Sequence, residues 1–274
     1  MLSVNTNYGA MIALQNLNAT NKQLEDTQNR VNTGLRISGP KDNGAIYAIA
    51  EGLRADVQSL SAVTSSINRT VSVVDTGIAA GTTVGDLLKE MKEKALAAKD
   101  TSIDANARAA YNSDFMALRD QITKTLASAG FDGSNLVNGT NTTILALANG
   151  DGTAFVTATG RNLSLGGAIV TVAAAGVVST AALASAMVTT LDASISNLNL
   201  AMSRLGTDSK KLGLHSTFMA KLADELTKGI GNLVDADLAT ESARLQALQT
   251  KQQLGIQALS IANQAPSTLL GLFR

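Results

Sequence analysis

The sequence predicts a mainly α fold, a long antiparallel helical coiled-coil bundle formed by the N- and C-terminal regions, with a small β-hairpin element in the middle. Only 3% of the 274 residues are aromatic and there is no Trp, so the apolar 45% is mostly aliphatic, which suits closely packed helices. Apolar residues alternate at intervals of three and four in both terminal regions, the pattern of a coiled coil. The middle is instead rich in Gly, Asn and Thr.

The first predicted helix has a seam of apolar residues: Leu14, Leu17, Leu24, Val31 and Leu35. Asn21 and Gln28 fill the remaining seam positions, which weakens the seam while restricting its register and its choice of partner. We therefore expect this helix to be marginal on its own in water and to need a partner.

The next segment, TGLRISGPKDNGAIYAIAEGLR, interrupts the helical pattern with Gly, Ser, Pro, Lys and Asp. Gly34 and Gly39 have the spacing of the glycines in a phosphate-binding P-loop. However, Pro40 and Lys41 stand where that motif needs Lys and then Ser or Thr, and a helix rather than a strand precedes them. The segment is therefore predicted to be a corner between two helices.

The second predicted helix has the stronger seam, with Thr64 as its one polar member: Ile46, Ile49, Leu53, Val57, Leu60, Ile67, Val71, Val74 and Ile78. We expect it to falter at GIAAGTTVGD, residues 77–86, and to resume as far as Met91, because glycines weaken a helix. A third helix follows and ends near Gly130. Its candidate N-caps are Asp100, Thr101 and Ser102.

Residues 131–179 are predicted to form the β element. Between Lys124 and Asp192 the only charged residues are Asp132, Asp151 and Arg161. Two β-favouring runs, which include Ile144, Leu145, Phe155 and Val156, flank the sequence NGDG at residues 149–152, a strong hairpin signal. The run AIVTVAAAGVV, residues 168–178, predicts a further strand.

Helix is predicted to return from Leu183 to Leu226, and Gly229 and Gly231 are expected to break it. A final helix is predicted over residues 235–263, with Pro266 ending it. Its apolar side carries Leu245, Leu248, Ile256 and Leu259. A marginal helix thus lies at each end of the chain, and we expect the two to need each other.

Composition excludes several functions. Lys plus Arg equals Asp plus Glu at 22 each, so nucleic acid and an anionic membrane are not predicted partners. No apolar run is long enough to span a membrane, and the first residues do not match a cleaved secretory signal. His215 is the only His and there is no Cys, so no metal site, cofactor or catalytic residue is predicted, and the chain is expected not to be an enzyme.

The corner and the last segment, DADLATESARLQALQTKQQLGIQALSIANQAPSTLLGLFR, together resemble bacterial flagellins. The corner is similar to the family's SGLRINSAKDDAAGLAIA, and FDGSNLVNGT is similar to its FNGxxLLxG turn. Pro40 replaces the usual Ala, and Asn43 and Gly44 replace Asp and Ala, so the corner is expected to be stiffer or differently angled. The short middle resembles the minimal kind of flagellin, which lacks outer variable domains.

The resemblance implies a structural subunit that polymerises into the bacterial flagellar filament for motility. Residues 1–40 would form an inner-tube helix paired with residues 235–274, and residues 41–234 an outer-tube helical domain containing the β element. The chain would be exported without a cleaved signal peptide and would lie extracellularly. Its partners would be itself as an open helical homopolymer, other flagellins, junction and cap proteins, and a flagellar export chaperone.

Two alternatives remain open from the sequence. The hook–filament junction protein shares the terminal helices with flagellin, although the ending ANQAPSTLLGLFR is more similar to flagellin. A secreted helical effector or adhesin could also show such heptads without Cys. Formation of long filaments from seeded monomer would distinguish flagellin from both.

The resemblance assigns site residues in four groups. For subunit packing they are Leu14, Leu17, Leu24, Val31, Leu35, Leu245, Leu248, Ile256, Leu259, Leu269, Leu270, Leu272 and Phe273. For corner and inter-subunit contacts they are Gly34, Arg36, Gly39, Pro40, Lys41 and Asp42. The segment LKEMKEK is similar to LQRxREL, which an animal innate receptor recognises, but Glu90 replaces a cation and Lys94 a Leu. Candidate O-glycosylation sites are Thr140, Thr142, Thr143, Thr153, Thr157, Thr159 and Ser164.

Overall fold

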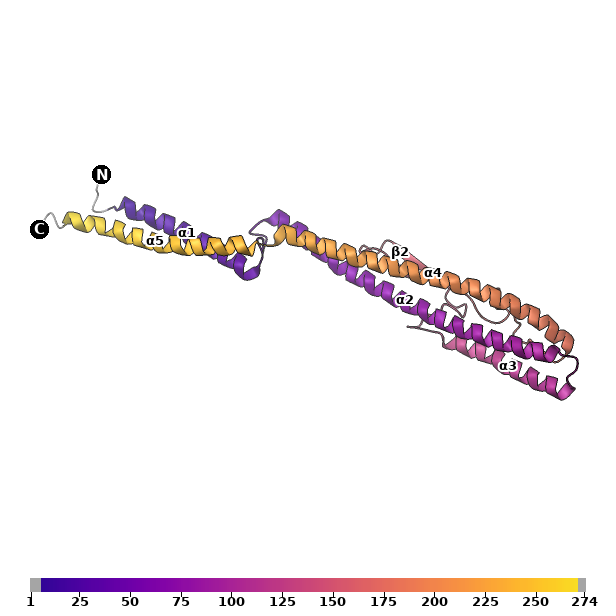
Figure 1. Cartoon of the computed structure of the whole chain (residues 1–274). Helices are drawn as coiled ribbons and strands as arrows, with labels where there is room; N and C mark the ends of the chain where they lie inside the picture. The colour runs from indigo at the N-terminus through magenta and orange to yellow at the C-terminus, as the bar shows by residue number, and fades with distance from the viewer. Residues whose placement is uncertain (1–5, 271–274) are drawn as a thin grey trace. The chain divides into compact units, whose positions relative to one another are not determined.

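The computed structural model describes residues 6–270. Over these residues the elements follow in the order α1 (Tyr8–Thr33), α2 (Gly44–Lys99), α3 (Ala105–Ser128), β1 (Thr143–Leu147), β2 (Phe155–Thr159), α4 (Ala181–Val234) and α5 (Leu238–Leu270). The predicted mainly α fold with a small β-hairpin is confirmed (Figure 1).

The chain forms two compact units. The terminal unit comprises Met1–Ala55 and Glu225–Arg274, and the central unit comprises Asp56–Asp224. In the terminal unit α1 lies beside α5, and in the central unit α2 lies beside α3 and α4 (Figure 1). Ion pairs link these central helices: Lys94 with Asp114 joins α2 to α3, and Lys92 with Asp192 joins α2 to α4.

The core of the central unit is a heptad seam along α2. Its buried residues recur at intervals of three and four: Leu60, Val63, Ile67, Thr70, Val74, Gly77, Gly81, Val84, Leu88, Met91, Ala95 and Ala98. The predicted seam residues Leu60, Ile67 and Val74 lie in it. Thr64, Val71 and Ile78 do not. The buried residues at these turns are Val63, Thr70 and Gly77, one position earlier in each case, and the three predicted residues are half-buried beside them.

Helix α2 continues through residues 77–86, so the predicted interruption is wrong. Glycines there allow close packing instead. A Cβ on Gly81 would lie 2.3 Å from Met202 Sδ, and one on Gly85 would lie 3.4 Å from Leu198 Cδ2. The helix tolerates these glycines because α4 packs directly against them, which offsets their low intrinsic propensity.

The hairpin pairs β1 with β2 antiparallel, with Thr143 opposite Thr159 and Leu147 opposite Phe155. Asn149 Oδ1 closes the turn by accepting from the amides of Thr153 and Ala154, both at 3.0 Å. Residues 168–178 form no strand, which corrects that prediction, although Val170, Val172 and Val178 are buried. The hairpin buries Ala146 and Ala158, while Leu145 and Phe155 are exposed.

Three predicted helix ends also differ. Asp104, rather than residues 100–102, caps α3 by accepting from Ala107 N at 2.6 Å. Helix α4 continues past Gly229 and Gly231 to Val234, and α5 continues past Pro266 to Leu270. A helix can thus continue past a single glycine or proline, because the turns on either side keep their own backbone hydrogen bonds.

Candidate functional site: the terminal helix pair and its corner

Helices α1 and α5 form an antiparallel pair in the terminal unit (Figure 1). Polar contacts along the pair fix the register of one helix against the other. Asn7 Nδ2 donates to Ala262 O at 2.6 Å, and Gln252 Nε2 donates to Asn21 Oδ1 at 2.8 Å. Asn21, predicted to be a seam residue, is instead exposed beside the seam.

The seam of this pair contains small and polar side chains that the apolar pattern did not reveal. Thr20, Leu24 and Thr27 are the buried residues of α1, and Leu248 and Glu241 are buried on α5. The Thr20 hydroxyl donates a hydrogen bond to Asn16 O at 2.9 Å, so it is not left unpaired in the seam. Gly255 allows close contact, since a Cβ there would lie 3.2 Å from Leu17 Cδ1.

An ion pair lies within this seam. Arg30 Nη1 donates to Glu241 Oε1 at 3.1 Å, and the two side chains are 35% and 11% exposed. Glu241 Oε2 is buried and has no hydrogen-bond partner among the described residues. The carboxylate therefore depends on Arg30 for its charge compensation.

Much of the apolar surface of the pair remains uncovered. Exposed residues are Tyr8, Met11, Ile12 and Leu14 on α1, and Leu238, Leu254, Ile256 and Ile261 on α5. Of the residues predicted for subunit packing, Leu24 and Leu248 are buried within the chain, Leu17, Val31, Leu35, Leu245 and Leu259 are half-buried, and Leu14 and Ile256 are exposed. Leu269 and Leu270 end α5, and Leu272 and Phe273 lie outside the described residues.

The corner is held by hydrogen bonds to the start of the C-terminal segment. Gly34 ends α1 in the left-handed conformation, with φ 70° and ψ 5°. Its carbonyl accepts from Ala236 N at 2.9 Å, and Val234 O accepts from Arg36 N at 2.7 Å. Arg36 Nη2 also donates to Leu233 O at 2.8 Å. Gly34 is needed because other residues occupy this conformation at a cost.

A β-turn from Gly39 to Asp42 completes the corner, with Asp42 N donating to Gly39 O at 3.1 Å. Pro40 occupies the second turn position, where its fixed φ is favourable. Asn43 Oδ1 then caps α2 by accepting from Ile46 N at 3.1 Å. The departures from the family pattern at Pro40 and Asn43 thus fit a rigid turn that leads directly into a capped helix.

The Asp42 carboxylate organises this turn. It accepts from Ser38 N at 2.9 Å, from Ser38 Oγ at 3.1 Å and from Gly39 N at 3.1 Å. These bonds, above all the one from the Ser38 amide, hold the pKa of Asp42 below its ordinary value, and the Arg30 charge adds to the effect. Hydrogen bonds to the ionised form favour it.

We predict that the corner loosens in acid. Because the folded pKa of Asp42 is depressed, its contribution is present above the unfolded pKa of about 3.9 and is lost as pH falls through the folded value. The protection factors of the Ser38 and Gly39 amides, which are corrected for the intrinsic pH dependence of exchange, measure this by NMR at neutral and acidic pH. In Asp42→Asn the same amides should lose this pH dependence, whereas an unchanged profile would exclude Asp42 as its source.

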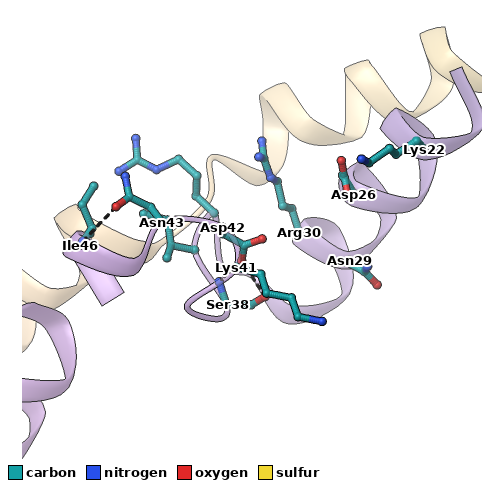
Figure 2. Close-up of a pocket in the computed structure, with 11 residues that line it drawn as sticks. Lys22, Asp26, Asn29, Arg30, Ser38, Lys41, Asp42, Asn43 and Ile46 are labelled. Atoms are coloured by element: carbon teal, nitrogen blue, oxygen red, sulfur yellow. Dashed lines mark hydrogen bonds between the residues drawn. The ribbon is translucent and has the colours of Figure 1, made fainter. Parts of the chain in front are cut away.

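A polar cavity of about 720 Å³ lies between α1 and the corner. Its charged lining comprises Lys22, Arg30, Arg36 and Lys41 against Asp26 and Asp42. Figure 2 shows Lys22, Asp26 and Arg30 along α1, and the loop from Ser38 to Asn43 facing them. With Arg30 paired to Glu241, the lining still has one more cation than carboxylates, and this suits contact with carboxylates of another protein surface.

The other predicted site residues lie in the central unit. Glu90 is exposed on α2, and Lys94 Nζ lies 3.1 Å from Asp114 Oδ2. Thr140, Thr142, Thr143, Thr153 and Thr157 are exposed, whereas Thr159 and Ser164 are half-buried. Within residues 6–270 no cluster of possible ligands could hold a metal ion. No helix there is apolar over enough residues to cross a membrane.

Comparison with known proteins now identifies the family. Residues 4–142 match the bacterial flagellin N-terminal helical region, and residues 188–273 match the bacterial flagellin C-terminal helical region. The chain is 53% identical over 272 residues to flagellin FljM of Caulobacter vibrioides, covering 99% of this chain and 98% of that protein. It is 35% identical to a flagellin of Brucella melitensis, covering 100% of both.

A solved structure, described as a flagellar hook-associated protein from Vibrio parahaemolyticus, shares the fold. The TM-score is 0.59 at 14% sequence identity, covering 71% of this chain and 100% of that chain. This likeness extends to the fold alone, so it does not favour the hook-junction alternative over the flagellins found in sequence. With both terminal regions matched and full-length relatives named flagellins, this chain belongs to the bacterial flagellin family, the structural subunits of the flagellar filament.

Proposed function

We propose that the terminal unit is the main polymerisation surface of this filament subunit. In the filament, the helices of residues 1–40 and 235–274 pair within each subunit and pack against those of neighbouring subunits to form the inner tube. Residues 41–234 form the surrounding tube. The observation that carries this proposal is the uncovered apolar surface of the α1–α5 pair.

Energetics support assembly through this pair. Within one chain its buried side chains include Leu24 and Leu248, but also the polar Thr20, Thr27 and Glu241. Burying a large apolar side chain contributes about 1.5–3 kcal/mol. Burial of the apolar side chains that are still exposed would therefore add more stability than the buried Leu24 and Leu248 now contribute. The pair is therefore marginal alone, and neighbouring subunits complete it.

The corner supplies a second set of contacts. Its rigid turn presents Arg36, Lys41 and Asp42 at the surface, and the adjoining cavity has excess positive charge. We assign these side chains to contacts with neighbouring subunits. Because a different patch on the next subunit meets each of these surfaces, the contacts are heterologous and give an open helical filament rather than a closed ring.

Seeded polymerisation tests this assignment. Heat-dissociated monomer mixed with short filament seeds should give long filaments by electron microscopy. Cleaving α1 and α5 from the monomer by limited proteolysis should abolish growth while leaving the helix signal of the central unit. Growth of normal filaments from the cleaved protein would exclude the terminal unit as the polymerisation surface.

The proposal extends to partners and export. We assign the exposed terminal helices to a flagellar export chaperone before assembly, and to junction and cap proteins at the ends of the filament. Other flagellins join by the same contacts. A marginal terminal pair also suits export as an unfolded chain without a cleaved signal peptide, because little structure must be undone.

We predict weak activation of the animal innate receptor. Lys94 replaces an apolar residue of the recognised motif and is held by Asp114, whose hydrogen bond raises the pKa of Lys94. Glu90 places a negative charge where the motif has a cation, and reversed charge weakens recognition. The double variant Glu90→Arg, Lys94→Leu should raise potency by about tenfold or more in a reporter-cell assay. Equal potency of the two proteins would contradict this.

We further propose O-glycosylation at exposed threonines of the β element, chiefly Thr140, Thr142, Thr143, Thr153 and Thr157. Their exposure supports this assignment over Thr159 and Ser164, which are half-buried. Intact mass spectrometry of native filaments should show an excess over the mass of the unmodified chain, and peptide mapping should place it between residues 140 and 164. An unmodified mass would exclude glycosylation.

A further inference from the structure

Two arginines of the central unit line one cavity away from the terminal helices. Arg161 follows β2 and Arg204 lies on α4, and the cavity between them has a volume of about 390 Å³. Asn162 and Asn197 add side-chain amides to its lining, while Ile169 and Leu200 add apolar surface. Leu200 is 54% exposed.

Neither guanidinium has a hydrogen-bond acceptor or an ion-pair partner within the part of the chain that the structure describes. Arg161 Nε is buried and unpaired, although its backbone amide donates to Leu136 O at 2.7 Å. The other three arginines of this unit are satisfied: Arg69 by Asp132, Arg108 by Ala98 O, and Arg119 by Asp120 and Gly176 O. An unpaired buried donor costs about 1–3 kcal/mol, so the Arg161 side chain lacks an acceptor among the described residues, whereas the Arg204 side chain is exposed and open to a ligand.

Nearby carboxylates do not fill this role. Asp208 lies one helical turn beyond Arg204, but its Oδ2 accepts from Thr159 N at 3.3 Å and its Oδ1 lies 3.8 Å from Lys211 Nζ. The sequence around Arg161 is almost free of charge: Asp151 and Asp132 are the nearest acidic residues before it, and Asp192 is the first acidic residue after it. Among the described residues neither guanidinium is paired with a carboxylate, so both positive charges remain available at this cavity.

We propose that this cavity is a binding site for a carboxylate group. Guanidinium groups bind carboxylates through parallel N–H···O bonds, and such charge-assisted bonds are stronger than neutral ones. The apolar wall at Ile169 and Leu200 suits the short aliphatic stem that carries the group. The carboxylate comes either from a free organic acid or from an Asp or Glu of a second copy of this chain, and the site is independent of the terminal polymerisation surface.

The first test uses the full-length monomer with succinate and citrate as probes, against chloride at equal ionic strength. Binding should appear by calorimetry and as a rise in the midpoint of thermal unfolding. Arg161→Gln, Arg204→Gln should weaken binding by about tenfold or more. The control Lys210→Gln removes a charge from the same helix at a residue outside the cavity lining, and it should bind as the parent does.

The second arm tests the other source of carboxylate. Suppose that the monomer binds neither probe. Filaments of the double variant should then dissociate at a lower salt concentration than Lys210→Gln filaments. That result would assign the bound carboxylate to an Asp or Glu of a second copy. Should the double variant lose its helix signal, Arg204→Gln alone carries both arms, because Arg204 is exposed on α4. Absence of probe binding together with identical salt sensitivity overturns the proposal.

Discussion

Replacing Leu254 and Ile261 by Asp should abolish filament growth while leaving a folded, soluble monomer. The two residues are one heptad apart on α5, so they share a face, and they are 59% and 70% exposed. The monomer therefore loses little. In the filament, however, each substitution removes about 2–3 kcal/mol of apolar burial and places a charge in the packed interior. Seeded growth followed by sedimentation and electron microscopy measures the loss.

The matched control is Gln246→Asp, Gln253→Asp. These residues are also one heptad apart on α5 and exposed, so the control adds the same two charges without removing apolar surface. It should form far more filament than the first variant at equal protein concentration. Equal polymerisation of the two variants would show that the apolar face of α5 does not drive assembly.

The second large effect is expected at the ion pair of the terminal seam. Arg30→Ala leaves the Glu241 carboxylate mostly buried and uncompensated, because its Oε2 already lacks a partner among the described residues. Breaking a fully buried pair costs about 3–5 kcal/mol, and the partial exposure of Arg30 reduces this to about 1–3 kcal/mol. Since the α1–α5 pair has few buried apolar contacts, that loss should separate its helices. A lowered first transition in thermal circular dichroism should report it.

Two controls distinguish charge from general disturbance. Arg244→Ala removes an exposed cation from α5 and should change stability by no more than about 0.5 kcal/mol. The double change Arg30→Met, Glu241→Met removes both charges and retains apolar volume, so it should recover most of the lost stability. Failure of this rescue would mean that Arg30 acts by packing rather than by charge.

The spacing of apolar residues predicted the helices well, but it identified only every second residue of each buried seam correctly. Leu24 in α1 and Ile67 in α2 occupy predicted seam positions. The intervening positions are Thr20 and Thr70, each of which donates its hydroxyl to the carbonyl four residues earlier. Because a threonine can thus bury its methyl group without an unsatisfied hydroxyl, a pattern that counts only apolar residues shifts the seam by one position.

Glycines within helices led to a different error, a predicted break where α2 is continuous. At Gly81 the missing side chain indicates close contact with α4 and not the predicted break, and Gly255, where no break was predicted, likewise lies close to Leu17 of α1. The sequence contains no local signal that separates these two roles, because the difference lies in what packs against the glycine. At Gly34, by contrast, the position at the end of a helical pattern correctly indicated a corner.

The site was predicted chiefly through its resemblance to a family. The corner residues Arg36 and Asp42 were identified in this way, and the structure then adds their contacts with Leu233 O and with Ser38. The seam contacts of Glu241 and Gln252 were not assigned, because polar residues gave no apolar signal and their partners are more than 200 residues away along the chain, at separations of 211 and 231. Long-range pairing of this kind requires the fold itself.

Hydrogen–deuterium exchange of monomer and filament tests the central claim most directly. If neighbouring subunits complete the α1–α5 pair, amides in residues 8–33 and 238–264 should exchange rapidly in the monomer and become strongly protected in the filament. Amides of α2 and α4 within residues 56–224 should be protected in both states. Equal, strong protection of α1 and α5 in monomer and filament would contradict the account, since it would show that a single chain stabilises the pair without neighbours.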